Sequence, residues 1–257
     1  MIELFHNHAS TCSQKVRICL AEKGLDYASR HIDLSKFEHL TPEYLAINPN
    51  GVVPALRHDG GVVIESTVIC EYLDEVFPQN PLSPAEPLQR AEMRAWLRFI
   101  DEVPSMAVRV PTFQNLILPS YQRLSKDEFV QLADSMPVRK QFIMRMGQEG
   151  FDNKEYQGSI DQLDRSLRRM EKAFESGAWI VGDQYSIADI CIFPVLHRMT
   201  ELSMEAMWEA DLPRVTDWYR RMTDRPSFAK AFYPEATLAF SMPQLREVKA
   251  GFAAARN

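Results

Sequence analysis

The run IELFHNHASTCSQKVRICLAEKG, residues 2–24, contains a strand, a polar turn and a helix in immediate succession. Residues 2–6 alternate as a short strand does, and apolar side chains then recur at helical spacing over residues 11–23 until Gly24 ends the helix. We expect a second strand over residues 27–34, so that the three elements form a βαβ unit with a right-handed crossover. This order predicts an α/β domain at the start of the chain.

The sequence that follows completes a small sheet. Residues 41–47 predict a short helix, and the sequence DGG at 59–61 is a strong hairpin signal between strands at 53–57 and 62–64. A further helix is expected over residues 66–77, with the serine at its start as the cap. The first domain is therefore predicted to have the element order βαβαββα.

A proline-rich linker separates this domain from a helical one. Four prolines in residues 78–87 exclude regular structure there, and the apolar pattern is almost wholly helical afterwards. We predict a domain over residues 1–77, the linker at 78–87, and an all-α helical bundle over 88–257. The expected helices span residues 88–102, 126–145, 156–176, 187–200 and 212–223, whereas prolines prevent residues 103–125 from forming one straight helix.

Composition excludes several classes of protein. Apolar residues make up 46% of the chain and charged residues 25%, and the net charge of −6 comes without any basic run, which argues against nucleic acid or an anionic membrane as a partner. Neither a secretory signal nor a membrane-spanning stretch is present, so a cytoplasmic location is expected. The cysteines form no CxxC pair and suggest neither a zinc site nor a disulfide framework; they are Cys12, Cys19, Cys70 and Cys191.

The turn between the first strand and the first helix is small and polar, and includes Ser10, Thr11, Cys12 and Ser13. A strand-to-helix turn directs free backbone N–H groups and the positive end of the helix dipole at one point, which stabilises an anion there. A thiolate would suit this place. The simpler alternative is that Ser10 or Thr11 caps the helix, and the two roles are compatible.

Two further features are weak by themselves. The sequence GVVPAL at residues 51–56 places Pro54 at the opening of a strand, where proline is tolerated and the preceding bond can be cis. Glu65 and Ser66 precede a helix, where the serine hydroxyl and N–H, together with the glutamate carboxylate, could hold the carboxylate and amine of an amino acid. Each arrangement is equally an ordinary structural device.

Taken in this order, the three features resemble the glutathione-binding domain of the cytosolic glutathione transferases. The resemblance covers essentially the whole chain and is carried by VRICLAEKGL at 16–25, NPNGVVPAL at 48–56 and ESTVICEYL at 65–73. It implies a thioredoxin-like N-terminal domain followed by the helical bundle, with glutathione as co-substrate, a small hydrophobic electrophile as its partner, and a homodimer. No metal is implied by any spacing of His, Cys, Asp or Glu.

The resemblance gives the polar turn a catalytic role. Ser10, six positions before Val16, matches the active-site hydroxyl or thiol of the serine- and cysteine-type classes. Cys12 and Ser13 lie in the same turn, so either could replace Ser10 as the group that faces the sulfur. A cysteine there would shift the chemistry towards mixed disulfides.

The same resemblance assigns the glutathione contacts. Val53, before the cis-proline Pro54, looks like the residue whose backbone pairs with the cysteinyl part of glutathione. Glu65 and Ser66 match the pair that holds the γ-glutamyl group, and His39 matches a histidine that some classes place on the glycyl carboxylate. A free thiol has a pKa near about 8.5, so a hydroxyl donating to the sulfur and a helix N-terminus would favour the reactive thiolate.

Expectations for the helical domain are of two kinds. Ser186 and Asp189 predict a capping box, and Tyr185 is expected to pack against Ile190 as a hydrophobic staple. Asp101 is either a solvated helix carboxylate or a contact for a glutathione amine. The candidate lining of the electrophile pocket consists of Asn7, His8, Phe99, Met106, Phe113 and Trp208, although apolar side chains in a helical bundle are usually core.

Within the family, three segments are similar to the bacterial glutathione-dependent β-etherases, which cleave β-aryl ethers of lignin-derived aromatics. They are residues 35–38, 61–77 and 90–94. The predicted reaction is attack of the glutathione thiolate on the carbon next to a ketone, with a phenolate as leaving group. The alternatives are a transferase acting on chlorinated or peroxide substrates and a non-catalytic protein that binds glutathione or another ligand.

Overall fold

The computed structural model describes residues 1–238, and residues 239–257 of the predicted helical domain lie outside the described residues. Strands β1 (Ile2–His6), β2 (Ala28–His31), β3 (Ala55–His58) and β4 (Gly61–Ile64) form one sheet in the order β2-β1-β3-β4. The helical elements of the first domain are α1 (Thr11–Lys23), the 3₁₀ turns η1 (Leu34–Lys36) and η2 (Glu38–Leu40), α2 (Pro42–Leu45) and α3 (Ser66–Val76). The predicted order βαβαββα is confirmed.

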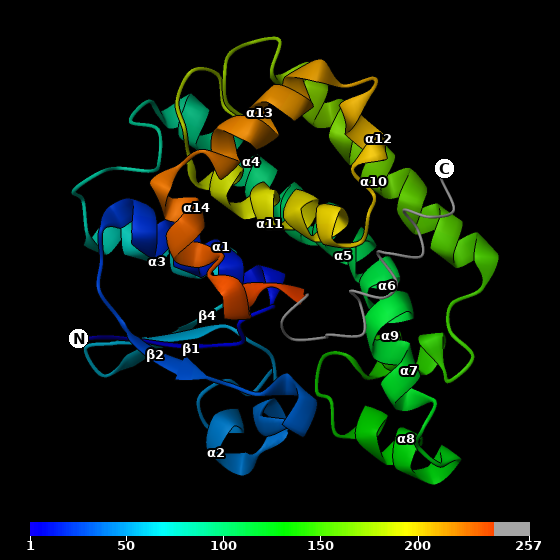
Figure 1. The fold of residues 1–257 in the computed structure, drawn as a ribbon. Coiled ribbons are helices and arrows are strands. Elements are labelled where there is room, and N and C mark those ends of the chain that lie inside the picture. Colours follow the sequence, from blue (N-terminus) through cyan, green and yellow to red (C-terminus); the bar gives the residue numbers. More distant parts are fainter. Residues whose placement is uncertain (239–257) are drawn as a thin grey trace.

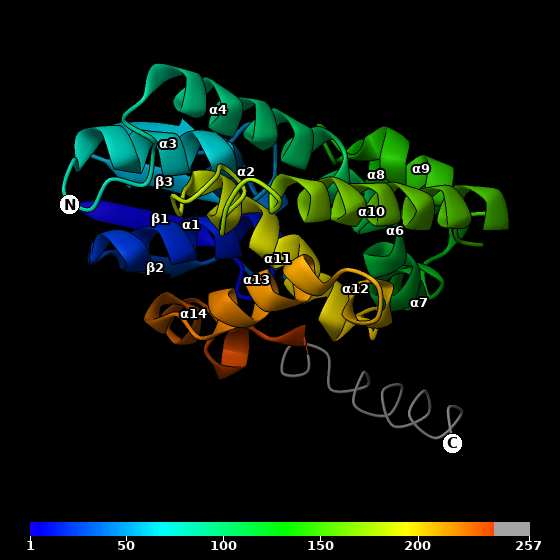
Figure 2. The ribbon, with the colours of Figure 1, turned by 90° about the horizontal axis from the view of Figure 1, so that it is seen from above.

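The described remainder of the chain is helical (Figures 1 and 2). Its longer helices are α4 (Pro87–Glu102), α8 (Lys126–Asp134), α9 (Lys140–Met146), α10 (Asn153–Ala173), α11 (Ile187–Glu201) and α13 (Pro213–Thr223). Its short elements are α5 (Pro104–Ala107), α6 (Arg109–Thr112), the π-helical η3 (Phe113–Ile117), α7 (Leu118–Tyr121), α12 (Ala206–Glu209), α14 (Pro226–Ala231) and η4 (Pro234–Ala236). Within residues 1–238 we find no helix both long and apolar enough to cross a bilayer.

Successive side chains of β1 point to opposite faces of the sheet, and helices pack on both faces. Leu4 joins the large buried cluster that includes α1 and α3, whereas Phe5 packs with Tyr44 of α2 in a separate cluster. Helices α1 and α3 therefore cover one face and α2 the other (Figure 1). Strands β1 and β2 run parallel, and β3 is antiparallel to both β1 and β4.

Turn chemistry sets the ends of several elements where the sequence predicts them. Helix α1 ends at Gly24, which has φ 66° in the left-handed region. The hairpin turn between β3 and β4 has φ 49° at Asp59 and 81° at Gly60, the positive pair that a two-residue turn of type I′ requires. The second strand is shorter than predicted, because η1 begins at Leu34 and β2 already ends at His31.

Three expectations about helix ends are wrong. The helix predicted over residues 126–145 is broken into α8 and α9 around Pro137, which cannot donate a helical hydrogen bond. Pro87 is the first residue of α4 and not the last of the linker, as proline favours a first helical turn. Ser66 does not cap α3: the cap position is Glu65, and no side chain accepts a capping hydrogen bond there.

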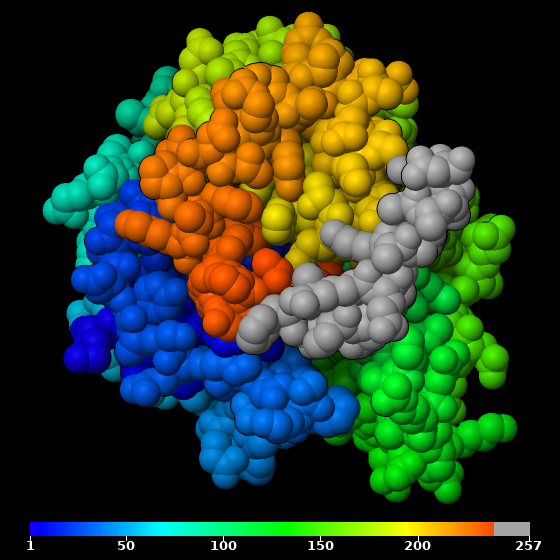
Figure 3. All heavy atoms as spheres, in the orientation of Figure 1, coloured from blue at the N-terminus to red at the C-terminus, as the bar shows by residue number. Residues whose placement is uncertain are grey.

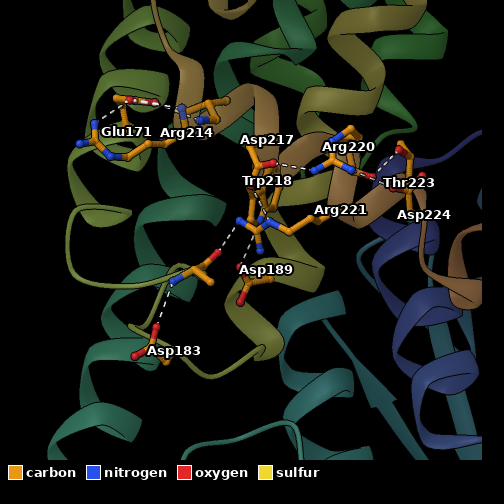
Figure 4. A network of polar contacts seen from close by, with 12 residues as sticks. Glu171, Asp183, Asp189, Arg214, Asp217, Trp218, Arg220, Arg221, Thr223 and Asp224 are labelled. Carbon is orange, nitrogen blue, oxygen red and sulfur yellow. Dashed lines mark hydrogen bonds and ion pairs between the residues drawn. The ribbon is translucent and has the colours of Figure 1, made fainter.

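The predicted capping box at the start of α11 is confirmed. The Asp189 carboxylate accepts from the Ser186 N–H at 3.0 Å and from Trp218 Nε1 at 2.9 Å, which ties α11 to α13 (Figure 4). Burial raises the pKa of Asp189 to about 6. Ion pairs along α13, including Arg214 with Glu171 at 3.1 Å, continue this network on the outside of the bundle.

Candidate functional site

Strand register brings the three sequence features to one edge of the sheet. Phe5 at the end of β1 pairs with Ala55 at the start of β3, and Ala55 pairs with Ile64 at the end of β4. The segments just beyond this row are the turn at 7–10, the Val53-Pro54 bond, and Glu65 with Ser66. Helices α1 and α3 both begin at this edge, so two helix N-termini with free N–H groups lie beside the turn.

The turn is fixed by bonds to its own backbone. Asn7 Oδ1 accepts from the Ala9 N–H at 3.1 Å, and Asn7 Nδ2 donates to the Ile32 carbonyl at 3.1 Å. Arg17 donates to the carbonyls of Asn7 at 3.2 Å and His8 at 2.7 Å, and Arg198 of α11 donates to the Ala9 carbonyl. Asn7, predicted to line the electrophile pocket, therefore holds the turn in shape.

The two serines of the turn have different environments. Ser13 is 0% exposed, and its hydroxyl accepts from the Asn7 N–H at 3.3 Å. Ser10 is half-buried and caps α1 by accepting from the Ser13 N–H at 3.3 Å. A capping hydroxyl uses only an oxygen lone pair, so the Ser10 O–H is free to donate to a sulfur. Cys12 is also half-buried and is a free thiol.

The loop before β3 presents unpaired backbone. The Val52 carbonyl accepts from Tyr44 Oη and from Asn48 Nδ2, both at 2.7 Å, which fixes the loop. The next bond, Val53-Pro54, is cis. Within residues 1–238 the N–H and carbonyl of Val53 have no hydrogen-bond partner, so both are available to the backbone of a bound peptide.

Glu65 occupies a backbone conformation that side chains other than glycine rarely adopt. Its φ is 69° and its ψ 117°, and its carboxylate accepts from Asn50 Nδ2 at 3.3 Å. This conformation turns the chain into α3, whose first residue, Ser66, is 7% exposed. The open N-terminus of α3 suits a carboxylate, and the Glu65 side chain suits an ammonium group.

Asp101 is partly exposed, and its carboxylate is held by two side chains of the first domain. It accepts from Lys15 Nζ of α1 at 3.0 Å and from Thr67 Oγ1 of α3 at 2.7 Å. Burial disfavours the charged form of Lys15, but neighbours that include the Asp101 carboxylate hold its pKa above the ordinary value. The sequence did not predict that Asp101 joins α4 to α1 and α3, because neither Lys15 nor Thr67 belongs to a motif that indicates a partner on α4.

His39 lies half-buried in η2. Burial lowers its pKa to about 4, and the positive charge of Arg139 contributes to the shift. Its Nδ1 is buried and has no hydrogen-bond partner among residues 1–238. The side chain is therefore neutral at pH 7 and able to offer only one N–H to a carboxylate.

The apolar neighbours of the turn were not foreseen from the sequence. Leu116 of η3 and Leu238 form a buried cluster, against which Ala9, Ile117 and Leu202 pack. Apart from Ala9, these aliphatic side chains come from three separate segments. Leu116 and Leu238 are buried, so the cluster is a small core that holds the turn against the helical part of the chain.

The predicted pocket residues are dispersed. Phe113 packs against Phe142 in the cluster formed by α6–α9, and Met106 on α5 is 42% exposed. Phe99 lies beneath Arg169, and Trp208 is 2% exposed in the core, so neither is brought to the turn. His8 stacks on His31 with ring centroids 3.9 Å apart, and its Nδ1 lies 2.5 Å from Tyr233 Oη.

The space-filling view shows one face of the molecule (Figure 3). The first domain, in blue, borders the orange-red segment at the end of the described chain, and the helices α6–α9, in green, lie at the lower right of the view. Among the described residues, no three His, Cys, Asp or Glu side chains gather in the way that a metal ion requires.

Known proteins match this chain over both parts. A family model for the glutathione S-transferase N-terminal domain matches residues 9–76, and one for the C-terminal domain matches residues 153–221. Protein LigF of Sphingobium sp. strain SYK-6 is 35% identical over 227 residues, 86% of this chain and 88% of LigF. Glutathione S-transferase TCHQD of Arabidopsis thaliana is 26% identical over 239 residues, 89% of this chain and 88% of its own length. The crystal structure of β-etherase LigF has a TM-score of 0.83 at 33% identity, and the match covers 90% of this chain and 98% of that one.

Proposed function

Because this chain belongs to the glutathione S-transferase family, we propose that it binds glutathione at the edge of the sheet where α1 and α3 begin. The predicted family is confirmed, and the protein is a glutathione transferase. In this proposal Val53 pairs with the cysteinyl backbone, Glu65 and the N-terminus of α3 hold the γ-glutamyl group, and His39 donates to the glycyl carboxylate. Pro54 and Ser66 keep these groups in place.

The exposure of Ser10 beside a buried Ser13 carries the catalytic assignment. Ser10 donates its hydroxyl proton to the sulfur while its oxygen still caps α1, and the helix N-terminus adds a favourable field. Each unit by which the thiol pKa falls requires about 1.4 kcal/mol, which one charge-assisted hydrogen bond and the helix field can supply. Ser10 stabilises the thiolate and does not itself become a nucleophile.

The proposed electrophile is an aromatic β-aryl ether ketone. The likeness to β-etherase LigF, at 35% identity in sequence, supports this choice over other transferase substrates. The thiolate forms a C–S bond at the carbon next to the ketone as the C–O bond to the aryl group breaks. The aryloxide leaves with the electron pair and takes a proton from water.

We also propose a cytoplasmic homodimer with domains at residues 1–77 and 88–257. A self-association surface is supported by two exposed valines on α3, Val68 and Val76. Beside them, Arg94 pairs with Glu71 at 2.7 Å and joins the first domain to α4. Apolar and charged groups on one face are what a symmetric interface between two copies uses.

Substitution of the turn residues one at a time tests the mechanism. Ser10→Ala should raise the pKa of the bound glutathione thiol, seen in its ultraviolet absorbance, and lower kcat at least about tenfold on phenoxyacetophenone. Ser13→Ala should chiefly lower the melting temperature, and Cys12→Ser should leave the thiol pKa near that of the unmodified protein.

Unchanged turnover and thiol pKa in Ser10→Ala would remove the hydroxyl from the mechanism. Tight glutathione binding with no turnover on β-aryl ether ketones, chlorinated aromatics or hydroperoxides would instead favour a non-catalytic binding protein.

A further inference from the structure

Two arginines beside the proposed site carry charges that the described chain leaves unpaired. Arg109 lies on α6, and Arg139 is the cap residue of α9; both are half-buried. Within residues 1–238 neither side chain makes a hydrogen bond or an ion pair. Arg145, on the same helix as the Arg139 cap, is by contrast paired with Glu155 at 2.5 Å.

The Arg109 guanidinium lies over the ring of Phe142, which is three residues after Arg139 on α9, so the two arginines belong to one patch. Burial lowers the pKa of Arg109 to about 10, and the charge of Arg139 adds to this effect. Burial also lowers the pKa of Arg139. Two like charges that are partly withdrawn from water raise the free energy of the folded protein, and a bound anion would remove that cost.

The charges of both arginines act on the turn that contains Ser10 and Cys12. Each is within electrostatic range of Cys12, which is two residues after Ser10 on α1. The Arg109 guanidinium carbon is 5.6 Å from the centroid of the Phe142 ring, and the Phe113 ring packs on Phe142 at 5.0 Å. Arg109 is therefore adjacent to aromatic surface, and both charges act on the turn.

Packing between the two parts of the chain places Arg139 near the loop before β3, which contains Gly51 and Val53. A Cβ at Gly51 would lie 3.1 Å from Pro137 Cδ and 3.1 Å from Leu40 Cδ2, so the segment before α9 lies against that loop and against η2. Leu40 also packs into the cluster formed by α6–α9. Arg139 follows Pro137 by two residues, and its charge reaches His39.

We propose that Arg109 and Arg139 together bind an anionic group on the electrophile, so that the second substrate is an aromatic compound carrying a carboxylate or a phenolate. Guanidinium groups match both anions with paired N–H donors, and the rings of Phe113 and Phe142 offer a face to the aromatic part. The glycyl carboxylate of glutathione could reach Arg139 beside His39. The glycyl carboxylate does not explain Arg109, which lies over the Phe142 ring and interacts electrostatically with Cys12 and Arg139.

The proposal rests on the proposed function and is tested with a matched pair of substrates. These are phenoxyacetophenone and its analogue with a para carboxylate on the phenoxy ring. We expect the unmodified protein to favour the carboxylate, and Arg109→Gln or Arg139→Gln to lower the ratio of kcat/KM for the two substrates about tenfold. Arg→Lys at either position should restore part of the ratio. The control Arg145→Gln, whose native side chain is already paired, should leave the ratio unchanged.

A ratio unaffected by both Gln variants would overturn the proposal. So would equal losses on both substrates together with a raised KM for glutathione, because the arginines would then be holding the tripeptide.

A binding measurement separates this inference from the proposed function. Calorimetry with unreactive para-phenoxybenzoate and with its neutral amide should show tighter binding of the carboxylate, lost in the Arg109→Gln, Arg139→Gln double variant. If neither ketone is turned over but this preference is present, the reaction is wrong and the anion site stands. If the ketones are turned over and the preference is absent, the anion site is wrong.

Discussion

At the scale of the residue, burial distinguishes two serines, Ser10 and Ser13, that the sequence places in the same turn. Ser10 and Ser13 have the same chemistry, and the turn around them gives no local reason to prefer one strongly. The structure separates them, because the Ser13 hydroxyl is enclosed against Asn7 while Ser10 reaches the surface. A motif can therefore predict which turn holds a thiolate, whereas the facing atom depends on packing.

Arg109 and Arg139 mark the limit of prediction from residue type. The groups proposed to contact glutathione belong to short local patterns and could be named in advance. An arginine without a partner has no such pattern, because pairing depends on which carboxylates the fold brings near it. An unpaired arginine can therefore be recognised only from the structure, which shows all of its neighbours among the described residues.

His6 provides a pH prediction at this scale. Burial, with a contribution from the charge of Arg17, lowers the pKa of His6 to about 3. Arg17 donates to His6 Nδ1 at 3.2 Å, which leaves the ring proton on Nε2, 2.8 Å from Ser29 Oγ. Unfolded His6 titrates near about 6.5, so its contribution to stability is full above that pH and is lost as the pH falls towards 3.

We expect His6→Gln to flatten the pH dependence of the free energy of unfolding. Between about pH 6 and pH 4 the slope should fall by about 1.4 kcal/mol per pH unit, the effect of one proton. Urea denaturation at several pH values measures this slope. Some slope should persist in the variant, because His8 and His39 also have lowered pKa values. An identical slope in both proteins would show that His6 is protonated in the folded state.

At the scale of the element, local signals predicted the bounds of α1, α11 and α3, but not the cap of α3. The first two have a cap side chain and a defined end within a few residues, so their bounds follow from the sequence. The start of α3 is set instead by the unusual backbone of Glu65, which residue type did not indicate. The break between α8 and α9 did have a signal in Pro137, which the helical pattern of its neighbours outweighed.

The strain at Glu65 leads to a prediction that separates backbone from side chain. At φ 69° glycine meets no steric penalty, so Glu65→Gly should be more stable than Glu65→Ala by about 1 kcal/mol. Both variants remove the carboxylate and should bind glutathione more weakly. Thermal unfolding and glutathione titration of the pair measure the two effects. Equal stability of the two variants would mean that the backbone relaxes on substitution.

At the scale of the whole molecule, the proposed domains share one interior. A single buried cluster joins Leu4 and Leu56 of the sheet, Leu20 of α1, Ile190 of α11 and Trp218 of α13. A linker rich in proline predicted two units, and the pattern of each unit was sufficient to predict its fold class. The packing of α1 against α11 was not predictable, because it depends on surfaces that neither unit reveals alone.

The contact from Lys15 to Asp101 connects these parts and gives the last prediction. The Lys15 side chain is 1% exposed and the Asp101 side chain 39% exposed. Asp101→Ala leaves the Lys15 ammonium buried with only Ser105 Oγ, at 3.4 Å, and takes the acceptor from Thr67. We expect a loss of about 2 to 3 kcal/mol in the free energy of unfolding, less than for a fully enclosed pair because solvent screens the carboxylate.

Since the interior is shared, this loss should shift one cooperative transition and not create a second one. Far-ultraviolet circular dichroism follows both parts, and tryptophan fluorescence follows the helical part alone, because all four tryptophans lie after the linker. The two signals should move together in Asp101→Ala. The double variant Lys15→Met, Asp101→Leu should regain most of the stability, and Glu102→Ala, at an exposed neighbour, should change little. Separate transitions for the two signals would mean that the buried contact joins two independently stable domains.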